Sequence, residues 1–319
     1  MTDRPLIAIL GATGAQGGGL ARAILADPWR TFAVRALTRD PGSPAALALA
    51  ALGAEVVRAD LDDPSSLPPA FAGAWGVFAV TNFWEHFSPE RELQQAANVA
   101  AALRQSEVRH VVWSTLEDTR QRVPLSDARM PTLLGRYKVP HFDAKGEADA
   151  LFWGLPVTCL RTSFYWDNLI HFGMGPRRGA DGVLELLLPT GERRMAGIAA
   201  ADIGPCALGI FRRTEKFAGR TVGIAGGHLT GAEMATALSQ ALGEPVRHVS
   251  MPFADYAALG FPGAADLANM FYYYHDFSDA LCAARPIETT RELHPSLMDF
   301  RQWLARYAMD IPVPRVAAV

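Results

Sequence analysis

The stretch LIAILGATGAQGG, from Leu6 to Gly18, decides the fold of this chain. A short apolar run ends at Gly11, and an alanine-rich pattern typical of a helix follows Gly14 and Gly17. We expect the first glycine to allow a tight turn, the second to let a pyrophosphate approach the backbone, and the third to let the helix pack closely on the strand. Free amides at a helix start attract phosphate. The stretch therefore predicts the strand–turn–helix unit that opens a dinucleotide-binding fold.

The composition is that of a globular protein without an extreme charge. Of 319 residues, 50% are hydrophobic and 20% charged, and the formal net charge is −3. A chain of this length can bury one large core or two modest ones. Its basic pairs are scattered, and its longest apolar stretch, about residues 45–54, is too short to span a bilayer. Neither a nucleic-acid partner nor a membrane partner is predicted.

The cysteines and histidines predict no metal site. Cys159, Cys206 and Cys282 have neither metal-binding nor redox spacing, and the eight histidines show no ligand spacing with them. The first expected strand begins soon after Met1, which leaves no room for a signal peptide. We therefore expect a cytoplasmic protein with reduced cysteines.

The first half of the chain alternates strands with helices. The expected strands cover residues 5–10, 33–38, 55–59, 75–80, 109–113 and 156–161. The expected helices between them cover residues 15–26, 43–52, 64–71, 90–105 and 139–153. Strands separated by helices of this length predict a parallel sheet with right-handed crossovers. The fold class is therefore α/β, with a Rossmann-type doubly wound parallel sheet.

After about residue 161 the regular alternation of strands and helices ends. Residues 183–188 and 195–198 predict a hairpin, and Thr230 with Glu233 predicts a capping box at the start of a helix. We predict an NADP-binding Rossmann domain in residues 1–161. Residues 162–319 are expected to form a smaller C-terminal α/β lobe, which can return segments to the Rossmann sheet.

Arg39 bears on the choice of cofactor. NAD-binding folds place an Asp or Glu after the second strand, where this chain has Arg39. A guanidinium there favours the 2′-phosphate of NADP, by roughly 1.5–3 kcal/mol for a charge-assisted hydrogen bond. The structural alternative is an exposed arginine paired with Asp40. The predicted cofactor is NADP(H).

Polar residues that follow other strands are expected to face the cofactor, because the carboxyl ends of the strands border the ligand in such a sheet. Asp60 is suited to the adenine amine, and Thr81 and Asn82 to ribose or nicotinamide. Tyr165 and Asn168 follow the sixth strand, although Asp167 beside them could be a helix cap. The residues predicted to contact the cofactor are Gly11, Thr13, Gly14, Ala15, Gln16, Gly17, Thr38, Arg39, Asp60, Leu61, Thr81, Asn82, Lys145, Tyr165 and Asn168.

The segment HFDAK, residues 141–145, holds the catalytic candidates. Short-chain dehydrogenases carry Tyr-x-x-x-Lys on a helix, where the tyrosine donates a proton and the lysine holds the ribose. Here Lys145 is present, and His141 stands at the tyrosine position one turn away. A histidine transfers protons near neutral pH, and Tyr137 is a second possible donor. The alternative for Lys145 is an exposed ion pair with Asp149.

A substrate pocket is expected beside these groups. Phe83 and Trp84 follow the fourth strand and could line such a pocket, although core packing is an equal alternative for each. Ser114 and Thr115 follow the fifth strand, where short-chain dehydrogenases keep their catalytic serine. For Thr115 the alternative is a polar residue that merely ends the strand.

Several motifs resemble the NmrA-like family of atypical short-chain dehydrogenases. They are GATGAQGG at 11–18, VTNFWE at 80–85 and HFDAKGE at 141–147. Further segments are similar to the HSCARG-type NADPH-sensor branch, namely PTGE at 189–192, MAG at 195–197, LGFPGA at 259–264 and DLANM at 266–270. The likeness extends to residues 302–304 and is weakest over 119–136 and from His275 onward.

The resemblance implies NADP(H) binding and self-association, with a homodimer as the expected state. Members typically lack the catalytic tyrosine, and many are redox sensors or regulators, whereas related plant reductases act with a lysine. The first hypothesis is therefore a redox-state sensor whose association with itself or a regulatory protein responds to NADPH/NADP⁺. The alternative is an NADPH-dependent reductase of a small apolar quinone, enone or carbonyl compound.

Overall fold

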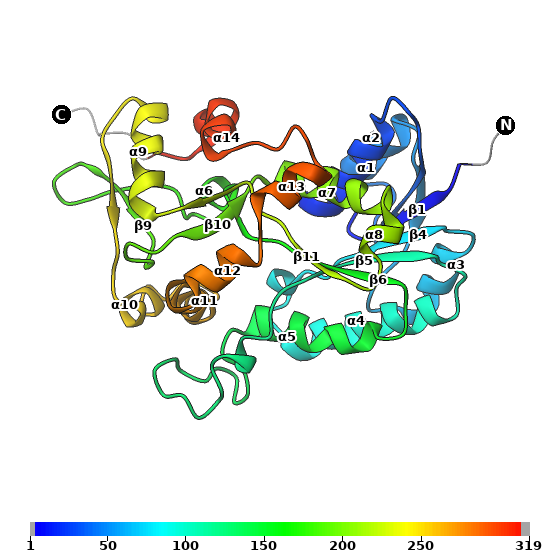
Figure 1. Cartoon of the computed structure of the whole chain (residues 1–319), viewed down its shortest axis with the longest axis horizontal. Helices are drawn as coiled ribbons and strands as arrows, with labels where there is room; N and C mark the ends of the chain where they lie inside the picture. The colour runs from blue at the N-terminus through cyan, green and yellow to red at the C-terminus, as the bar shows by residue number, and fades with distance from the viewer. Residues whose placement is uncertain (1–3, 314–319) are drawn as a thin grey trace.

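The centre of the molecule is a seven-stranded parallel sheet, seen on the right of Figure 1. The computed structural model describes residues 4–313. The strand order is β11-β6-β5-β4-β1-β2-β3, and every neighbouring pair is parallel. The strands are β1 (Leu6–Ile9), β2 (Ala33–Thr38), β3 (Glu55–Arg58), β4 (Gly76–Ala79), β5 (His110–Thr115), β6 (Val157–Arg161) and β11 (Thr221–Gly223). The predicted α/β, Rossmann-type fold is confirmed.

Helices cover both faces of this sheet because its strands are apolar on both sides. In β1, Ile7 and Ile9 pack into one core, and Ala8 packs into the core on the opposite face, as the alternation of a strand requires. The first face carries α1 (Ala15–Leu25), α2 (Pro44–Ala51), α7 (Ala200–Phe211), α8 (Thr214–Phe217) and α13 (Ile287–Leu293) (Figure 1). The second carries α3 (Leu67–Phe71), α4 (Pro89–Arg104) and α5 (Pro140–Ala148).

The chain returns to the large sheet after it has left it. Strand β11 adds to the edge of the sheet beside β6, and α7 packs against α1. Residues beyond 161 thus supply one strand and a helical cover to the large sheet. The two lobes consequently share a wide interface.

The smaller lobe contains two three-stranded sheets, and here the predicted hairpin is wrong. One sheet consists of β7 (Phe164–Tyr165), β10 (Met195–Ile198) and β12 (Gly227–Leu229), and the other of β8 (Arg177–Arg178), β9 (Leu184–Leu187) and β13 (Val246–Val249). Strand β10 is buried along its whole length. It pairs with β7 and β12 on its two edges, whereas β9 pairs with β8 and β13. Both strands therefore pair with partners that are distant in the sequence and not with each other.

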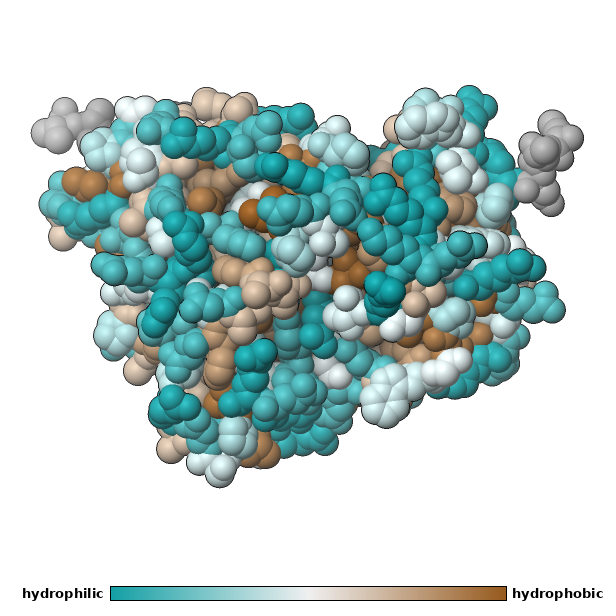
Figure 2. Space-filling view, viewed as in Figure 1, coloured by the Kyte–Doolittle hydropathy of each residue, from teal (hydrophilic) through white to brown (hydrophobic). Residues whose placement is uncertain are grey.

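The smaller lobe also contains helices α6 (Asn168–His171), α9 (Gly231–Leu242), α10 (Phe253–Ala257), α11 (Ala264–Asp276), α12 (Ser278–Ala283) and α14 (Phe300–Tyr307), and the 3₁₀ turn η5 (Ala308–Asp310). Another 3₁₀ turn, η2 (Phe83–Glu85), follows β4 of the large sheet. The predicted capping box of Thr230 and Glu233 begins α9. Among residues 4–313, no helix combines the length and apolar character needed to cross a membrane. On the face shown in Figure 2, apolar residues lie in small groups between polar ones.

Candidate functional site

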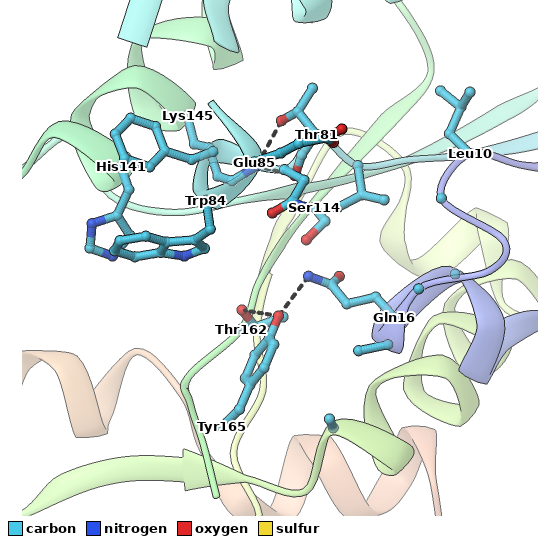
Figure 3. A pocket seen from close by; sticks show the side chains of 18 of the residues that line it. Leu10, Gln16, Thr81, Trp84, Glu85, Ser114, His141, Lys145, Thr162 and Tyr165 are labelled. Carbon is cyan, nitrogen blue, oxygen red and sulfur yellow. Dashed lines mark hydrogen bonds between the residues drawn. The ribbon is translucent and has the colours of Figure 1, made fainter. Parts of the chain in front are cut away.

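A cleft of about 860 Å³ runs along the carboxyl ends of the parallel strands and is closed by the smaller lobe. Figure 3 shows its interior. Its volume is in the range of cofactor and small-molecule sites. Every residue predicted to contact the cofactor lines this cleft, and so do Phe83, Trp84, Ser114, Thr115 and His141.

The glycine turn has the geometry that its spacing predicts. Gly11 has a φ of +61°, which disfavours any residue with a side chain. A Cβ atom on Gly17 would lie 2.5 Å from the Gly11 carbonyl oxygen, so only glycine permits this approach of α1 to the turn. Helix α1 has no side-chain cap at Gly14, and its first residues open into the cleft. Free amide donors therefore face the cleft at this end.

Two buried polar atoms of the cleft lack a hydrogen-bond partner among the described residues. They are Gln16 Oε1 and Ser163 Oγ. The other end of the Gln16 amide is fixed, because its Nε2 atom donates to the Tyr165 hydroxyl over 2.6 Å (Figure 3). Burial raises the pKa of Tyr165 to about 12, so this hydroxyl keeps its proton at neutral pH. Unpartnered buried polar atoms are costly unless a ligand or water meets them.

At the opposite end of the glycine turn, Arg39 forms an ion pair with Glu85 of η2. The predicted alternative partner, Asp40, instead accepts a hydrogen bond from the Gly42 amide. Asp60 similarly accepts from the amide of Asp62 at 3.0 Å. Arg39 therefore lies at the cleft with a partner that is far away in the sequence.

Lys145 lines the cleft and is bonded to Thr81, which follows β4, and to Glu92 of α4. Its Nζ atom lies 2.7 Å from Glu92 Oε1, 2.7 Å from Thr81 Oγ1 and 3.0 Å from the Thr81 carbonyl oxygen. These contacts occupy its three N–H donors. The exposed pair with Asp149 is wrong, because that carboxylate accepts from Trp113 Nε1 and Thr115 Oγ1 at 2.9 and 2.6 Å.

Glu92 of α4 is a functional-site candidate that the sequence analysis missed. Its side chain is fully buried. Burial raises the pKa of its carboxyl, but the Lys145 ammonium, the His86 ring 3.5 Å away, and hydrogen bonds from Lys145 and Thr81 together lower it to about 2. Glu92 therefore stays ionised, and it neutralises Lys145 inside the protein. A helical surface pattern gives no signal that such a carboxylate is buried.

His141 lies in an aromatic setting at the closed end of the cleft. Its ring centroid is 4.7 Å from that of Trp84 and 6.0 Å from that of Phe83 (Figure 3). Its Nδ1 atom lies 2.7 Å from Asp266 Oδ1. Asp266 comes from α11 in the smaller lobe, so it was also missing from the sequence-based site.

Tyr137 is not part of the site, and its prediction as a proton donor is wrong. Pro140 begins α5, so Tyr137 precedes the helix rather than extending it by one turn. Its ring is fully buried and lies 5.3 and 5.1 Å from the guanidinium groups of Arg120 and Arg136. It does not line the cleft.

The closed end of the cleft forms a chamber with apolar walls, which we call the aromatic chamber. Its walls are Phe83 and Trp84 of η2, Phe142 of α5, Phe172 after α6, and Leu267, Met270 and Tyr274 of α11. The α11 residues have helical spacing, a pattern that indicates a buried face but not which ligand it meets. Thr115 borders the cleft but directs its hydroxyl to Asp149, whereas Ser114 points toward the cleft interior (Figure 3).

Other carboxylates near the cleft stabilise the protein itself. Asp63 caps the turn at Pro64, and Asp62 pairs with Arg91. Asp167 accepts from the Ala200 amide at the start of α7 and not from its own helix. Within residues 4–313, no cluster of His, Cys, Asp and Glu could hold a metal ion.

The comparison with protein families decides the relationship. The model described as "NmrA-like family" matches residues 3–304. This chain belongs to the NmrA-like family. Among curated relatives, the NmrA-like family domain-containing oxidoreductase hkm9 of Aspergillus hancockii is 31% identical over 83% of this chain and 81% of its own. The corresponding oxidoreductase FrzB of Cladobotryum sp. is 28% identical over 89% and 88%.

Solved structures share the fold at low identity. The negative transcriptional regulator NmrA in complex with NADP has a TM-score of 0.72 at 21% identity, covering 96% of this chain and 95% of its own. The Citrobacter sp. triphenylmethane reductase complexed with NADP(H) has a TM-score of 0.72 at 21% identity, covering 94% and 99%. An NADPH-dependent quinone oxidoreductase of Escherichia coli has 0.69 at 21%, covering 94% and 98%.

Proposed function

We propose that this protein is an NADP(H)-dependent reductase of a small apolar carbonyl, enone or quinone compound. The observation that carries the proposal is the continuity of the cleft, from the free amides of the glycine turn to the aromatic chamber beside His141. A protein that only binds a dinucleotide has no need of an apolar chamber next to a proton-transferring group.

The residues of the cleft fit such a cofactor. The amides at the start of α1 suit the pyrophosphate, and Arg39 suits the 2′-phosphate. The unpartnered Gln16 Oε1 and Ser163 Oγ atoms can accept and donate hydrogen bonds to the polar groups of the nicotinamide half. When bound, NADPH would supply the hydride.

The chain's own contribution would be orientation and a proton. The aromatic chamber holds the apolar substrate and excludes water. His141, as an imidazolium, gives the proton on Nε2 to the substrate oxygen, and water then restores it. Lys145 holds Thr81 and Glu92 in place rather than acting as a free cation, because its three donors are occupied.

The names of relatives support this proposal. Both curated relatives above are named oxidoreductases. Two of the structures with this fold are named as a triphenylmethane reductase with NADP(H) and an NADPH-dependent quinone oxidoreductase.

A second candidate function is that of a cytoplasmic redox sensor of the HSCARG type, with a homodimer that responds to NADPH/NADP⁺. The observation in its favour is the replacement of the expected catalytic tyrosine by His141. The neighbouring fold of the NmrA regulator, described in complexes with NAD and with NADP, supports it too.

The deciding experiment measures NADPH oxidation with menadione, cinnamaldehyde and an aromatic ketone, in the wild type and in His141→Gln. We expect turnover in the wild type and a loss on the order of 10²-fold in the variant, with an unchanged dissociation constant for NADPH. NADPH binding without turnover of any probe would contradict the reductase. The sensor would then require that NADPH and NADP⁺ give different oligomer masses.

A further inference from the structure

The strongest unexplained arrangement in the molecule is the contact between the two lobes at Asp266. Its carboxylate meets two groups of a single residue: Oδ1 lies 2.7 Å from His141 Nδ1, and Oδ2 accepts from the His141 backbone amide at 3.2 Å. The side chains are only 7% and 8% exposed, so water hardly competes for these bonds.

The two bonds determine which ring nitrogen carries the proton. A carboxylate can only accept hydrogen bonds, so the Nδ1 atom must donate. In the neutral ring, Nε2 is then the unprotonated nitrogen. This Nε2 atom has no hydrogen-bond partner in the described part of the chain. It is not fully buried either, so it borders the cleft that His141 lines.

The position of Asp266 is itself fixed by packing. One turn further along α11, Asn269 Nδ2 donates to the carbonyl oxygens of Pro131 and Lys138, at 2.8 and 2.5 Å. Lys138 leads directly into α5, whose N-cap, Val139, offers no side-chain cap. The same face of α11 therefore holds both the start of α5 and the ring that this helix carries.

The other charged groups near this ring are engaged elsewhere. On α5 itself, Asp143 accepts from Thr119 and from the amides of Lys138 and Val139, and Lys145 is bonded to Glu92. On η2, Glu85 pairs with Arg39 and the ring neighbours are aromatic. Asp266 is the acidic group hydrogen-bonded to the imidazole.

We infer that Asp266 is a positioning residue that fixes His141 in its Nδ1–H tautomer, so that Nε2 faces the aromatic chamber and exchanges the proton of the reduction. This inference rests on the proposed reductase. In the reduction, a hydride adds to the substrate carbon and the carbonyl π electrons move to oxygen. That oxygen takes the proton from Nε2 of the imidazolium, which leaves the neutral Nδ1–H ring beside Asp266.

The test is Asp266→Asn, which keeps the shape of the side chain but offers a single oxygen. The backbone N–H of His141 can only donate, so it bonds to that oxygen. The side-chain NH₂ group of the variant then faces Nδ1. Because this NH₂ group donates, Nδ1 must accept and is therefore unprotonated. The neutral ring then carries its proton on Nε2. We therefore expect the variant to reverse the tautomer.

The chain offers a matched control in Asp202→Asn. Asp202 also accepts from one imidazole and one backbone amide, those of His294 at 3.2 Å and Met298 at 2.9 Å, and it does not line the cleft. The Asp202→Asn variant therefore measures how much stability is lost when such a carboxylate is replaced outside the cleft.

Tautomers are measured by ¹⁵N NMR of histidine-labelled protein at a pH where the ring is neutral, with His141→Gln for assignment. We expect Nδ1–H in the wild type and Nε2–H in Asp266→Asn. With menadione and NADPH, kcat of this variant should fall on the order of 10²-fold, while KM and the NADPH dissociation constant stay near wild type. Asp202→Asn should change none of these.

A wild-type ring protonated on Nε2 would overturn the inference, even if Asp266→Asn does not fold. So would wild-type kcat in Asp266→Asn, or equal kcat losses in the two Asp→Asn variants. If wild-type protein binds NADPH but reduces no probe, the reductase proposal fails by itself, and the tautomers still decide whether Asp266 fixes the ring.

Discussion

Two ion pairs at the cleft differ in their exposure to water. We call their surroundings the open end, at Arg39 and Glu85, and the closed end, at Lys145 and Glu92. At the open end, the side chains of Arg39 and Glu85 are 57% and 40% exposed. At the closed end, Lys145 and Glu92 are 11% and 0% exposed and share Thr81 as a hydrogen-bonding partner. Water screens the first pair and is almost excluded from the second. The open end is therefore suited to exchange Glu85 for a ligand phosphate, whereas the closed end keeps a fixed geometry.

The largest expected effect comes from removing one partner of the Lys145–Glu92 ion pair. Lys145→Met leaves the Glu92 carboxylate buried and unpaired, so the free energy of unfolding should fall by about 3–5 kcal/mol in urea titrations. The double variant Lys145→Met, Glu92→Gln should recover most of this loss. Lys216→Met, which removes an exposed pair with Glu292, is the control and should cost far less, because water screens that pair. Equal losses in the two lysine variants would contradict the contrast between the ends.

Low pH should weaken the ion pair between Lys145 and Glu92. The pKa of Glu92 in the folded protein is about 2, below the ordinary value of 4.5. The stabilisation is then fully present above about pH 4.5 and is lost as the pH falls toward 2. We expect the difference in unfolding free energy between wild type and Glu92→Gln to shrink from pH 5 to pH 3. A difference independent of pH would mean that Glu92 is not ionised in the folded protein.

At the open end, Arg39→Ala tests the 2′-phosphate. We expect the dissociation constant for NADPH to rise about ten- to a hundredfold and that for NADH to change little, because only NADPH carries the phosphate. Fluorescence titration of the purified variant measures both constants. Equal losses for the two cofactors would remove the role assigned to Arg39.

The smallest expected effect is that of Glu85→Gln. Removing an exposed competitor for Arg39 should tighten NADPH binding by up to about fivefold, since such pairs contribute at most about 1 kcal/mol. Glu292→Gln, which removes another exposed carboxylate from an ion pair outside the cleft, is the control. Weaker NADPH binding in Glu85→Gln would show instead that Glu85 orients Arg39 for the phosphate.

Local signals in the sequence determined the sheet and the open end of the cleft. The glycine spacing at Gly11 and Gly17 follows from sterics within a few residues, and the strand–helix alternation specifies a parallel sheet. Because the carboxyl ends of such strands meet at one edge, residues such as Thr81 and Tyr165 could be placed at the cleft from their positions alone.

Only the tertiary structure decided the partners of the buried polar groups. The partner of Lys145 is Glu92 and that of His141 is Asp266, on elements that approach only when the helices dock. The same holds for β9 and β10, which are neighbours in the chain but pair in different sheets. The physical reason is that burial and hydrogen bonding are satisfied by the whole packed molecule, and the sequence around a residue does not specify which distant group will meet it.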